Sequence, residues 1–364
     1  MRITKLFLFT LALSTSLCAQ DIKVVGTLER PLHNSQFKSS KATHAQRQIK
    51  LLKVELNQPA NDIINRRTDL VLNKSTPVIT STFTPNLPRK IDLGMNDVPV
   101  LDQGNYGSCV TFATTTALNA AMNQGDYISQ LCQLQLGNYL ETNGYIPSGW
   151  NGSLGRTVLS QIDTFGIINK EKQKIMGCGG LTQYPSQNEA IPTTSISVEQ
   201  FKQLSENLNE KTGWSPILDL FTAIERVDTN KTISDIKIAL NENDRVTVGV
   251  LLLDFDLGLM GAVGTHNAKL DTWVLTPEIA RDIYLRPTFG GHEMVITGYD
   301  DDATAVDDQG RVHKGLFSLR NSWGDKVGNK GDFYMSYDYF KVLVIEAQRI
   351  HTMPADGGMD SIRA

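Results

Sequence analysis

The chain has 364 residues, of which 40% are hydrophobic and 20% charged, and its formal net charge at pH 7 is −4. This composition is ordinary for a globular protein and excludes collagen-like, coiled-coil and wholly disordered chains. Beyond the N-terminus no apolar run reaches the roughly 18 residues of a membrane span, and no basic patch alternates with aromatic residues. We therefore expect neither a membrane anchor nor nucleic-acid binding.

Residues 1–19 have the organisation of a cleaved secretory signal. Arg2 and Lys5 precede a short apolar run, and small residues lead up to Ala19. The signal predicts a secreted protein, in an extracellular, periplasmic or lysosome-like compartment. Lipidation of Cys18 is the alternative, and the bulky residue before it disfavours this.

Residues 20–88 are polar and poor in aromatic side chains. The alternating stretch 50–57, KLLKVELN, predicts one strand, and Pro85 and Pro88 mark a boundary. Two dibasic pairs, at 66–67 and 89–90, are expected to be exposed sites of proteolytic trimming.

Charge is divided unevenly between this segment and the rest of the chain. Residues 20–88 carry ten Lys/Arg and five Asp/Glu, whereas from residue 89 onward there are 23 basic and 34 acidic residues. One interpretation is an ordinary solvated surface. The other is a basic segment that docks on an acidic body with the help of charge and is released by acid.

The body alternates between helical and strand patterns in chain order. Helices are expected at 108–124, 154–164, 198–208 and 231–242, and strands at 245–253, 292–299 and 315–321. The first part is therefore helix-rich and the later part strand-rich, which predicts an α+β fold in two lobes.

Cys109 lies in the stretch QGNYGSC, at the predicted start of a helix. Unpaired N–H groups and the helix dipole favour a thiolate at that place, and the thiolate is the nucleophilic form of cysteine. Gln103 lies six residues upstream, so that its amide and the Cys109 N–H are candidate donors to an oxyanion. After signal cleavage Cys109, Cys132 and Cys178 remain, and an odd count in an oxidising compartment predicts one disulfide and one free thiol.

A cysteine nucleophile needs a base and a group that orients it. Among the six histidines, only His292 begins an apolar strand. Asn321, in RNSWG at the end of a later strand, offers a carbonyl oxygen to the imidazole. Trp323 is placed to cover that hydrogen bond from water.

The motifs QGNYGSC, GGHEMVITGY and LRNSWG occur in this order and resemble the signatures of the papain-like (C1) cysteine peptidases. In that family the His and Asn typically follow the Cys by roughly 130–150 residues. Here His292 and Asn321 lie 183 and 212 residues beyond Cys109, so the body resembles the family with insertions.

The resemblance implies a two-lobed papain-like fold, with a central helix of the helical lobe carrying the Cys and a β-barrel-like lobe carrying the His and Asn. It further implies Cys109 as nucleophile, His292 as base, Asn321 as its orienter and Gln103 in the oxyanion hole. Cys132 and Cys178 resemble a family disulfide within the helical lobe. No metal or cofactor is implied. An Asp-rich stretch at 300–312 is expected to be a solvated hairpin turn, because it lacks the pattern of a calcium-binding loop.

The chain also departs from the family pattern. Tyr106 and Trp150 stand where relatives usually carry two bonded cysteines, and Ser153 stands where a glycine is common. The possible substrate cleft comprises Asn151, Gly152, Ser153 and Glu293. Glu293 directly follows His292, and it either favours basic substrate side chains or faces solvent.

The expected organisation is a signal at 1–19, a prosegment at 20–88, a peptidase domain at 89–350 and a C-terminal tail at 351–364. The expected function is that of a secreted, monomeric cysteine protease, made as a zymogen, that cleaves proteins or peptides and is inhibited by its own prosegment. The alternatives are a catalytically suppressed binding protein on the same scaffold, or an acyl transferase or exopeptidase that uses the same site.

Overall fold

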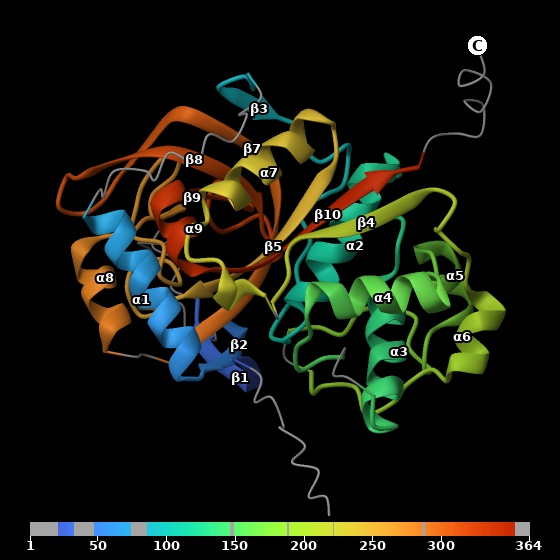
Figure 1. Cartoon of the computed structure of the whole chain (residues 1–364). Coiled ribbons are helices and arrows are strands. Elements are labelled where there is room, and N and C mark those ends of the chain that lie inside the picture. The colour runs from blue at the N-terminus through green and yellow to red at the C-terminus, as the bar shows by residue number, and fades with distance from the viewer. Residues whose placement is uncertain are drawn as a thin grey trace, which may run out of the picture.

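The computed structural model describes residues 21–32, 47–73, 86–145, 149–187, 189–220, 222–285 and 288–353. The predicted signal and nearly all of the predicted tail lie outside these residues. Figure 1 shows the helices α2 to α6 gathered on one side and the strands, with α7, α8, α9 and α1, on the other. The predicted α+β arrangement in two lobes is confirmed.

The helical lobe is built around a helix that is buried along most of its length. Its helices are α2 (Cys109–Met122), α3 (Gln130–Thr142), α4 (Gly155–Phe165), α5 (Lys170–Met176) and α6 (Val198–Leu204). Three consecutive threonines in α2 are fully or nearly fully buried, and Thr115 satisfies its hydroxyl on the carbonyl of Thr111 at 2.8 Å. Burial rather than helix propensity therefore holds α2 in place. The helix predicted at 198–208 is shorter, because Ser205 adopts an extended conformation.

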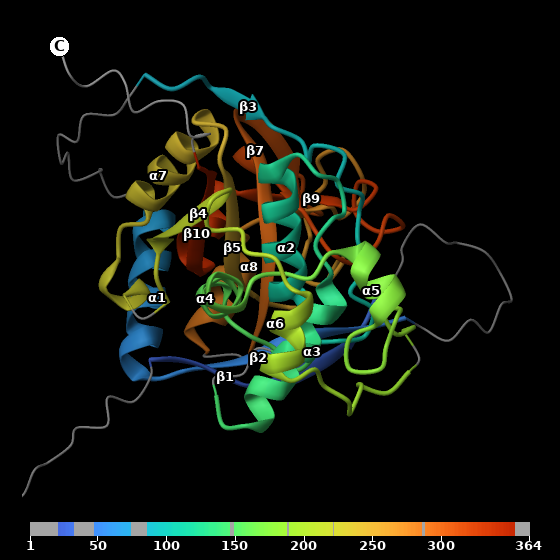
Figure 2. The same ribbon diagram turned by 90° about the vertical axis from the view of Figure 1, so that its right-hand side faces the viewer.

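The strands form one sheet that extends through the other lobe. Its main path runs β4 (Thr212–Leu218), β10 (Val344–Thr352), β5 (Arg245–Leu252), β7 (Phe289–Val306), β8 (Val312–Arg320), β9 (Asp332–Ser336) and β6 (Thr272–Trp273). A short strand, β3 (Lys90–Asp92), pairs with β7. All eight residues of β5 are buried, as the apolar run predicted. In Figure 2 the helix α2 lies beside β5 and β7, which places the start of α2 against the strand that contains His292.

The remaining helices surround the sheet lobe. They are the short 3₁₀ turn η1 (Ala223–Glu225), α7 (Asn230–Asn241), α8 (Pro277–Tyr284) and α9 (Tyr337–Leu343). No helix of the described residues combines the length and the apolar character that crossing a bilayer requires.

The segment 20–88 holds more regular structure than its composition predicted. It forms the hairpin β1 (Ile22–Pro31) and β2 (Gln48–Leu56) and the helix α1 (Gln58–Leu72). Asn57 caps α1 by accepting the N–H of Ala60 at 3.0 Å, and a proline occupies the first turn, which is favourable there. The sequence had indicated only one strand here. β2 also pairs with β7, so the hairpin belongs to the main sheet.

The dibasic pair at 66–67 is not an exposed trimming site. Arg67 is 2% exposed within α1. Its guanidinium donates to the carbonyls of Val344 and Ala223, each at 2.7 Å, and to that of Arg226 at 3.0 Å. Burial lowers the pKa of Arg67 to about 10. The helix α1 is therefore anchored to the body from two separate segments.

Candidate active site

Cys109 is the first residue of α2 and is fully buried. Ser108, at the N-cap position, does not cap the helix with its side chain, because its hydroxyl lies 3.0 Å from the Tyr184 hydroxyl. The first-turn N–H groups of Cys109 and Val110 thus remain to act on the sulfur. Burial raises the pKa of Cys109 to about 12, against the opposing hydrogen bonds from the backbone N–H groups of Glu293, Val110 and Cys109.

His292 is held in one tautomer by Asn321. Its Nε2 lies 2.8 Å from Asn321 Oδ1, which also accepts the backbone N–H of Ser322 at 2.7 Å. Because a backbone N–H can only donate, that atom of Asn321 is the oxygen, and His292 Nε2 must carry the proton. His292 Nδ1 is then the basic nitrogen, and it has no hydrogen-bond partner. Burial lowers the pKa of His292 to about 4, although the bond to Asn321 acts in the opposite direction.

Trp323 packs on the imidazole of His292. The two rings are stacked with centroids 4.6 Å apart at an angle of 25°, and Trp323 is fully buried. Both rings lie in the interior, so that water has no direct access to the His292–Asn321 bond.

Gln103 connects the two lobes beside this group. Its backbone N–H donates to the carbonyl of Ser322 at 2.8 Å, and its side-chain oxygen accepts the Ser322 hydroxyl at 2.7 Å. Its side-chain nitrogen donates to the carbonyl of Tyr106 at 2.8 Å. Since an amide nitrogen has two protons, one N–H of Gln103 is left for another acceptor.

The residues predicted to line a cleft differ in exposure. Asn151 is exposed, whereas Gly152, Ser153 and Glu293 are buried. Gly152 has φ +118°, and a methyl group on it would come within 2.5 Å of Leu52 Cδ2. Glycine is therefore required here on two counts, backbone conformation and space.

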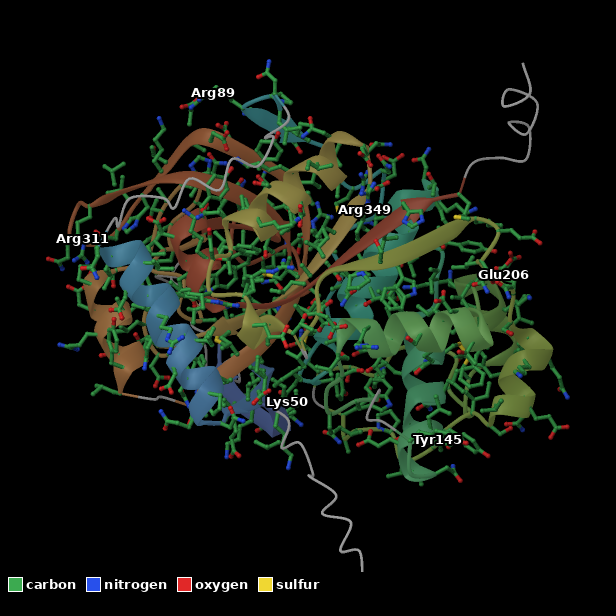
Figure 3. The ribbon with its side chains drawn as sticks, in the orientation of Figure 1. Lys50, Arg89, Tyr145, Glu206, Arg311 and Arg349 are labelled. Atoms are coloured by element: carbon green, nitrogen blue, oxygen red, sulfur yellow. A yellow bond between two sulfur atoms is a disulfide. The ribbon has the colours of Figure 1, made fainter. Side chains whose placement is uncertain are left out.

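The hairpin β1–β2 lies over these residues. A methyl group on Gly107 would come within 3.1 Å of Thr27 Cγ2, and one on Gly291 within 3.3 Å of Leu52 Cβ. Figure 3 labels Lys50 on this hairpin, at the lower edge of the molecule. Sequence patterns gave no signal for these contacts, because strand pairing over more than two hundred residues leaves no local trace.

Arg47, the residue before β2, contacts both lobes. Its guanidinium donates to the carbonyl of Trp323 at 2.8 Å and forms an ion pair with Asp102, the residue before Gln103. The sequence did not single out Arg47.

The described cysteines form one disulfide and leave one free thiol, as their odd number predicted. Cys132 and Cys178 form a disulfide, which joins α3 to the loop after α5, and Cys109 is free. Tyr106 and Trp150 lie against each other with ring centroids 5.2 Å apart. An aromatic contact thus stands at the two positions where the resemblance implies a disulfide that this chain lacks.

The Asp-rich stretch forms the β7–β8 hairpin and is ion-paired rather than simply solvated. Asp302 accepts two hydrogen bonds from Arg89, each at 2.6 Å, and lies 2.9 Å from Lys314. Figure 3 shows Arg89 beside β3, at the opposite edge of the molecule from Lys50. No three His, Cys, Asp or Glu side chains within the described ranges converge as metal ligands would.

Residues 263–352, which include His292 and Asn321, match the model of the Peptidase C1-like family. This part of the chain is therefore similar to the papain-like C1 cysteine peptidases. A search of curated proteins found no match.

Several solved structures are similar to this chain. Xylellain, a cysteine protease from Xylella fastidiosa, is 20% identical with a TM-score of 0.45, and the match covers 73% of this chain and 87% of that one. The proform of Amb a 11, a ragweed pollen cysteine protease, is 16% identical with a TM-score of 0.45 and coverages of 76% and 62%. Digestive procathepsin L 3 of Tenebrio molitor is 16% identical, with a TM-score of 0.42 and 83% coverage of both chains.

Proposed function

We propose that Cys109 is the nucleophile of this peptidase, His292 its general base and then acid, and Asn321 the group that orients His292. The observation that carries the proposal is the directed pair His292–Asn321, which leaves Nδ1 as the basic nitrogen. The backbone N–H of the next residue, Glu293, favours the thiolate of Cys109, which opposes the effect of burial on the thiol pKa. The start of α2 therefore lies against the strand β7 that carries His292.

The chemistry follows from these positions. His292 Nδ1 takes the thiol proton, and the Cys109 sulfur attacks the carbonyl carbon of the peptide bond. The oxygen of the tetrahedral intermediate accepts hydrogen bonds from the Cys109 N–H and the second N–H of Gln103. His292 then gives its proton to the leaving amine, and an acyl-enzyme forms. A water molecule, deprotonated by His292, releases the carboxylic acid and restores the thiol.

We further propose that the segment 20–88 inhibits the enzyme until it is displaced, and that the signal 1–19 directs the chain to secretion. Leu52 and Thr27 occupy the space over Gly152 and Gly107. A substrate backbone requires the same space next to Cys109. In the full chain, burial raises the pKa of Cys109 and lowers the pKa of His292. The covered enzyme therefore holds a neutral thiol and a neutral imidazole instead of the reactive thiolate–imidazolium pair.

A thiol-directed epoxysuccinyl probe tests the proposal. The full chain is treated with the probe before and after limited proteolysis of the N-terminal segment, and cleavage of a peptide library is followed in parallel. We expect Cys109 to be labelled and peptides to be cleaved after activation, but not before. Absence of both after activation would reject the peptidase proposal in favour of the catalytically suppressed alternative.

A Cys109→Ala chain provides the control for self-processing. If the N-terminal segment is removed by the enzyme itself, this variant stays at full length under conditions in which the wild type is trimmed. Equal trimming of both chains would show that another protease activates the enzyme.

A further inference from the structure

A loop of the helical lobe, residues 184–187, lies against the segment 102–108 that precedes the proposed nucleophile. The Tyr106 hydroxyl donates to the carbonyl of Ser186 at 2.7 Å, across a separation of 80 residues in the chain. The first residue of the loop, Tyr184, makes two further contacts with the same segment. The loop therefore helps to set the position of the segment relative to the helical lobe.

Tyr184 connects two residues of this segment through one hydroxyl. Its oxygen lies 2.9 Å from the backbone carbonyl oxygen of Gln103 and 3.0 Å from the Ser108 hydroxyl oxygen. A carbonyl only accepts and a tyrosine hydroxyl has a single proton, so Tyr184 donates to Gln103. The Ser108 hydroxyl is then the donor to Tyr184. The three groups form a hydrogen-bond chain with one direction, from Ser108 through Tyr184 to Gln103.

Both ends of this chain lie next to a proposed oxyanion donor. Gln103 supplies a side-chain N–H, and Ser108 directly precedes Cys109, whose backbone N–H is the second donor. Two donors serve one oxyanion only when their positions are fixed, because hydrogen bonds weaken steeply as distance and angle depart from the optimum. A link between Gln103 and Ser108 therefore bears directly on the geometry of the oxyanion site.

The Tyr184 hydroxyl also completes the hydrogen bonding of Gln103, which is fully buried. The backbone N–H and the side-chain oxygen of Gln103 bond to Ser322, and its side-chain nitrogen donates to Tyr106. Tyr184 supplies the donor to the remaining group, the backbone carbonyl. Without the hydroxyl this buried carbonyl loses its donor, and since unpaired buried polar groups are costly, Gln103 is then free to shift.

Three aromatic rings hold the ring of Tyr184. Its centroid lies 5.2 Å from that of Phe112, 5.4 Å from that of Trp150 and 5.8 Å from that of Tyr106. The contacts with Phe112 and Tyr106 are edge-to-face, at 80° and 87°, an arrangement that aromatic pairs favour. Phe112 belongs to the first turn of α2. The same helix that begins with Cys109 therefore fixes the ring that carries the hydroxyl.

Two of these rings, Tyr106 and Trp150, stand at the positions where the resemblance implies a disulfide that this chain lacks. They contact each other, and Tyr184 packs against both. In this chain an aromatic cluster and the Tyr184 hydroxyl therefore connect the segment 102–108 to the helical lobe without a covalent bond.

We propose that Tyr184 is a positioning residue of the peptidase reaction, whose hydroxyl keeps the Gln103 side chain and the Cys109 backbone N–H directed at the oxygen of the tetrahedral intermediate. The inference rests on the proposed peptidase function. Tyr184 acts through Gln103 and Ser108, and it needs no contact with the substrate. Removal of its hydroxyl therefore weakens stabilisation of the transition state more than binding of the substrate.

Tyr184→Phe tests the role of the hydroxyl, because phenylalanine keeps the ring and its aromatic contacts. The full chain with this change is activated by limited proteolysis and compared with the wild type on one fluorogenic peptide. Loss of an oxyanion donor itself lowers kcat about 100- to 1000-fold. Loss of a group that positions the donors should lower kcat at least about tenfold and change KM less than about twofold.

Tyr127→Phe is the matched control for this change. The Tyr127 hydroxyl is bonded to Glu206 and Asn169 within the helical lobe, and it has no contact with the segment 102–108. We expect kcat and KM of this variant to equal those of the wild type.

Two inhibitors separate a positioning role from a general structural one. A peptide aldehyde adds the Cys109 sulfur to its carbonyl carbon, and the resulting thiohemiacetal oxygen occupies the oxyanion position. Iodoacetamide forms a thioether with loss of iodide and creates no oxyanion. Tyr184→Phe should weaken aldehyde binding at least about fivefold, while the alkylation rate stays within about twofold of the wild type. Equal losses in both measurements, or no loss in either, would overturn the positioning role.

A double variant tests whether Tyr184 acts through Gln103. When Tyr184→Phe is added to Gln103→Ala, kcat should fall less than the product of the two single effects, because both changes disturb one interaction. Effects that multiply would overturn the inference and leave the peptidase proposal intact. Absence of alkylation and cleavage in the activated wild type would overturn both.

Discussion

Leu52 and Gly291 are paired across β2 and β7, and His292 is the next residue of β7. The side chain of Leu52 also touches Gly152, so a single leucine fills the gap between the sheet and the helical lobe. At this point the strand that carries the proposed base therefore pairs with β5 on one side and with the N-terminal strand β2 on the other.

Shortening Leu52 should loosen this cover. Leu52→Ala removes buried apolar contacts, and such changes cost about 2–5 kcal/mol. Even about 1.4 kcal/mol taken from the docking of the hairpin increases its open population tenfold. We expect iodoacetamide to label Cys109 in the full-length variant at least ten times faster than in the wild type.

The exposed Leu72 at the end of α1 provides the matched control, since it is 45% exposed. Leu72→Ala should leave the labelling rate unchanged. Equal rates for Leu52→Ala and the wild type would show that the hairpin does not limit access to Cys109.

Salt should have little effect on the cover. Within the described residues, the ion pair that joins the hairpin to the body is Arg47–Asp102, with side chains 20% and 38% exposed. Pairs as exposed as this contribute about 0–1 kcal/mol and are screened by salt. Cys109 labelling of the full chain should therefore change less than about fivefold between low salt and 1 M NaCl. A larger increase would restore the charge-driven docking that the uneven sequence charge had indicated.

The helices and the strand that carry or adjoin the site could be predicted from the sequence, because the pattern of residues within each segment determines them. Apolar periodicity predicted α2, α4, α7 and β5, and the odd cysteine count left one thiol free. The contact between Tyr106 and Trp150 likewise agrees with two positions that changed together.

The contacts made by the N-terminal segment could not be predicted in the same way. β2 meets β7 after more than two hundred intervening residues, and nothing in its alternating pattern selects that partner. The sequence predicted an exposed Arg67, because dibasic pairs are normally exposed. Its guanidinium can be buried because it donates hydrogen bonds to backbone carbonyls of distant segments.

Asn321→Ala should impair catalysis while leaving the thiol in place. The change removes the acceptor that fixes His292 in its tautomer, and an unsatisfied buried group costs about 1–3 kcal/mol. We expect kcat of the activated enzyme to fall about 10- to 100-fold with little change in KM. Asn209→Ala, at an exposed position, is the control. An unchanged kcat would remove Asn321 from the proposed site.

The pH dependence of Cys109 labelling should distinguish the covered and open forms. In the covered form the pKa of Cys109 is about 12, so its reactive thiolate is about one part in a thousand at pH 9 and becomes more abundant as the pH rises. His292, with a pKa of about 4, stays neutral over the same range. Labelling of the full chain should increase steadily up to pH 10, whereas the activated enzyme should already react rapidly near pH 7. A full chain that reacts rapidly at pH 7 would contradict the proposed inhibition.

Arg67 should be one of the most sensitive positions for stability. It is a buried cation whose charge is compensated by backbone carbonyls of two segments, η1 and the α9–β10 junction. Arg67→Ala leaves those carbonyls without a donor and creates a cavity between α1 and the body, so the free energy of unfolding should fall by about 3–5 kcal/mol.

Arg66, its exposed neighbour in α1, provides a control of identical chemistry. Arg66→Ala should change the free energy of unfolding by less than about 0.5 kcal/mol. Urea unfolding of the full chain, followed by tryptophan fluorescence, measures both variants. Equal stability of the two would mean that α1 detaches from the body without cost, and the helix would then be expected to leave together with the hairpin on activation.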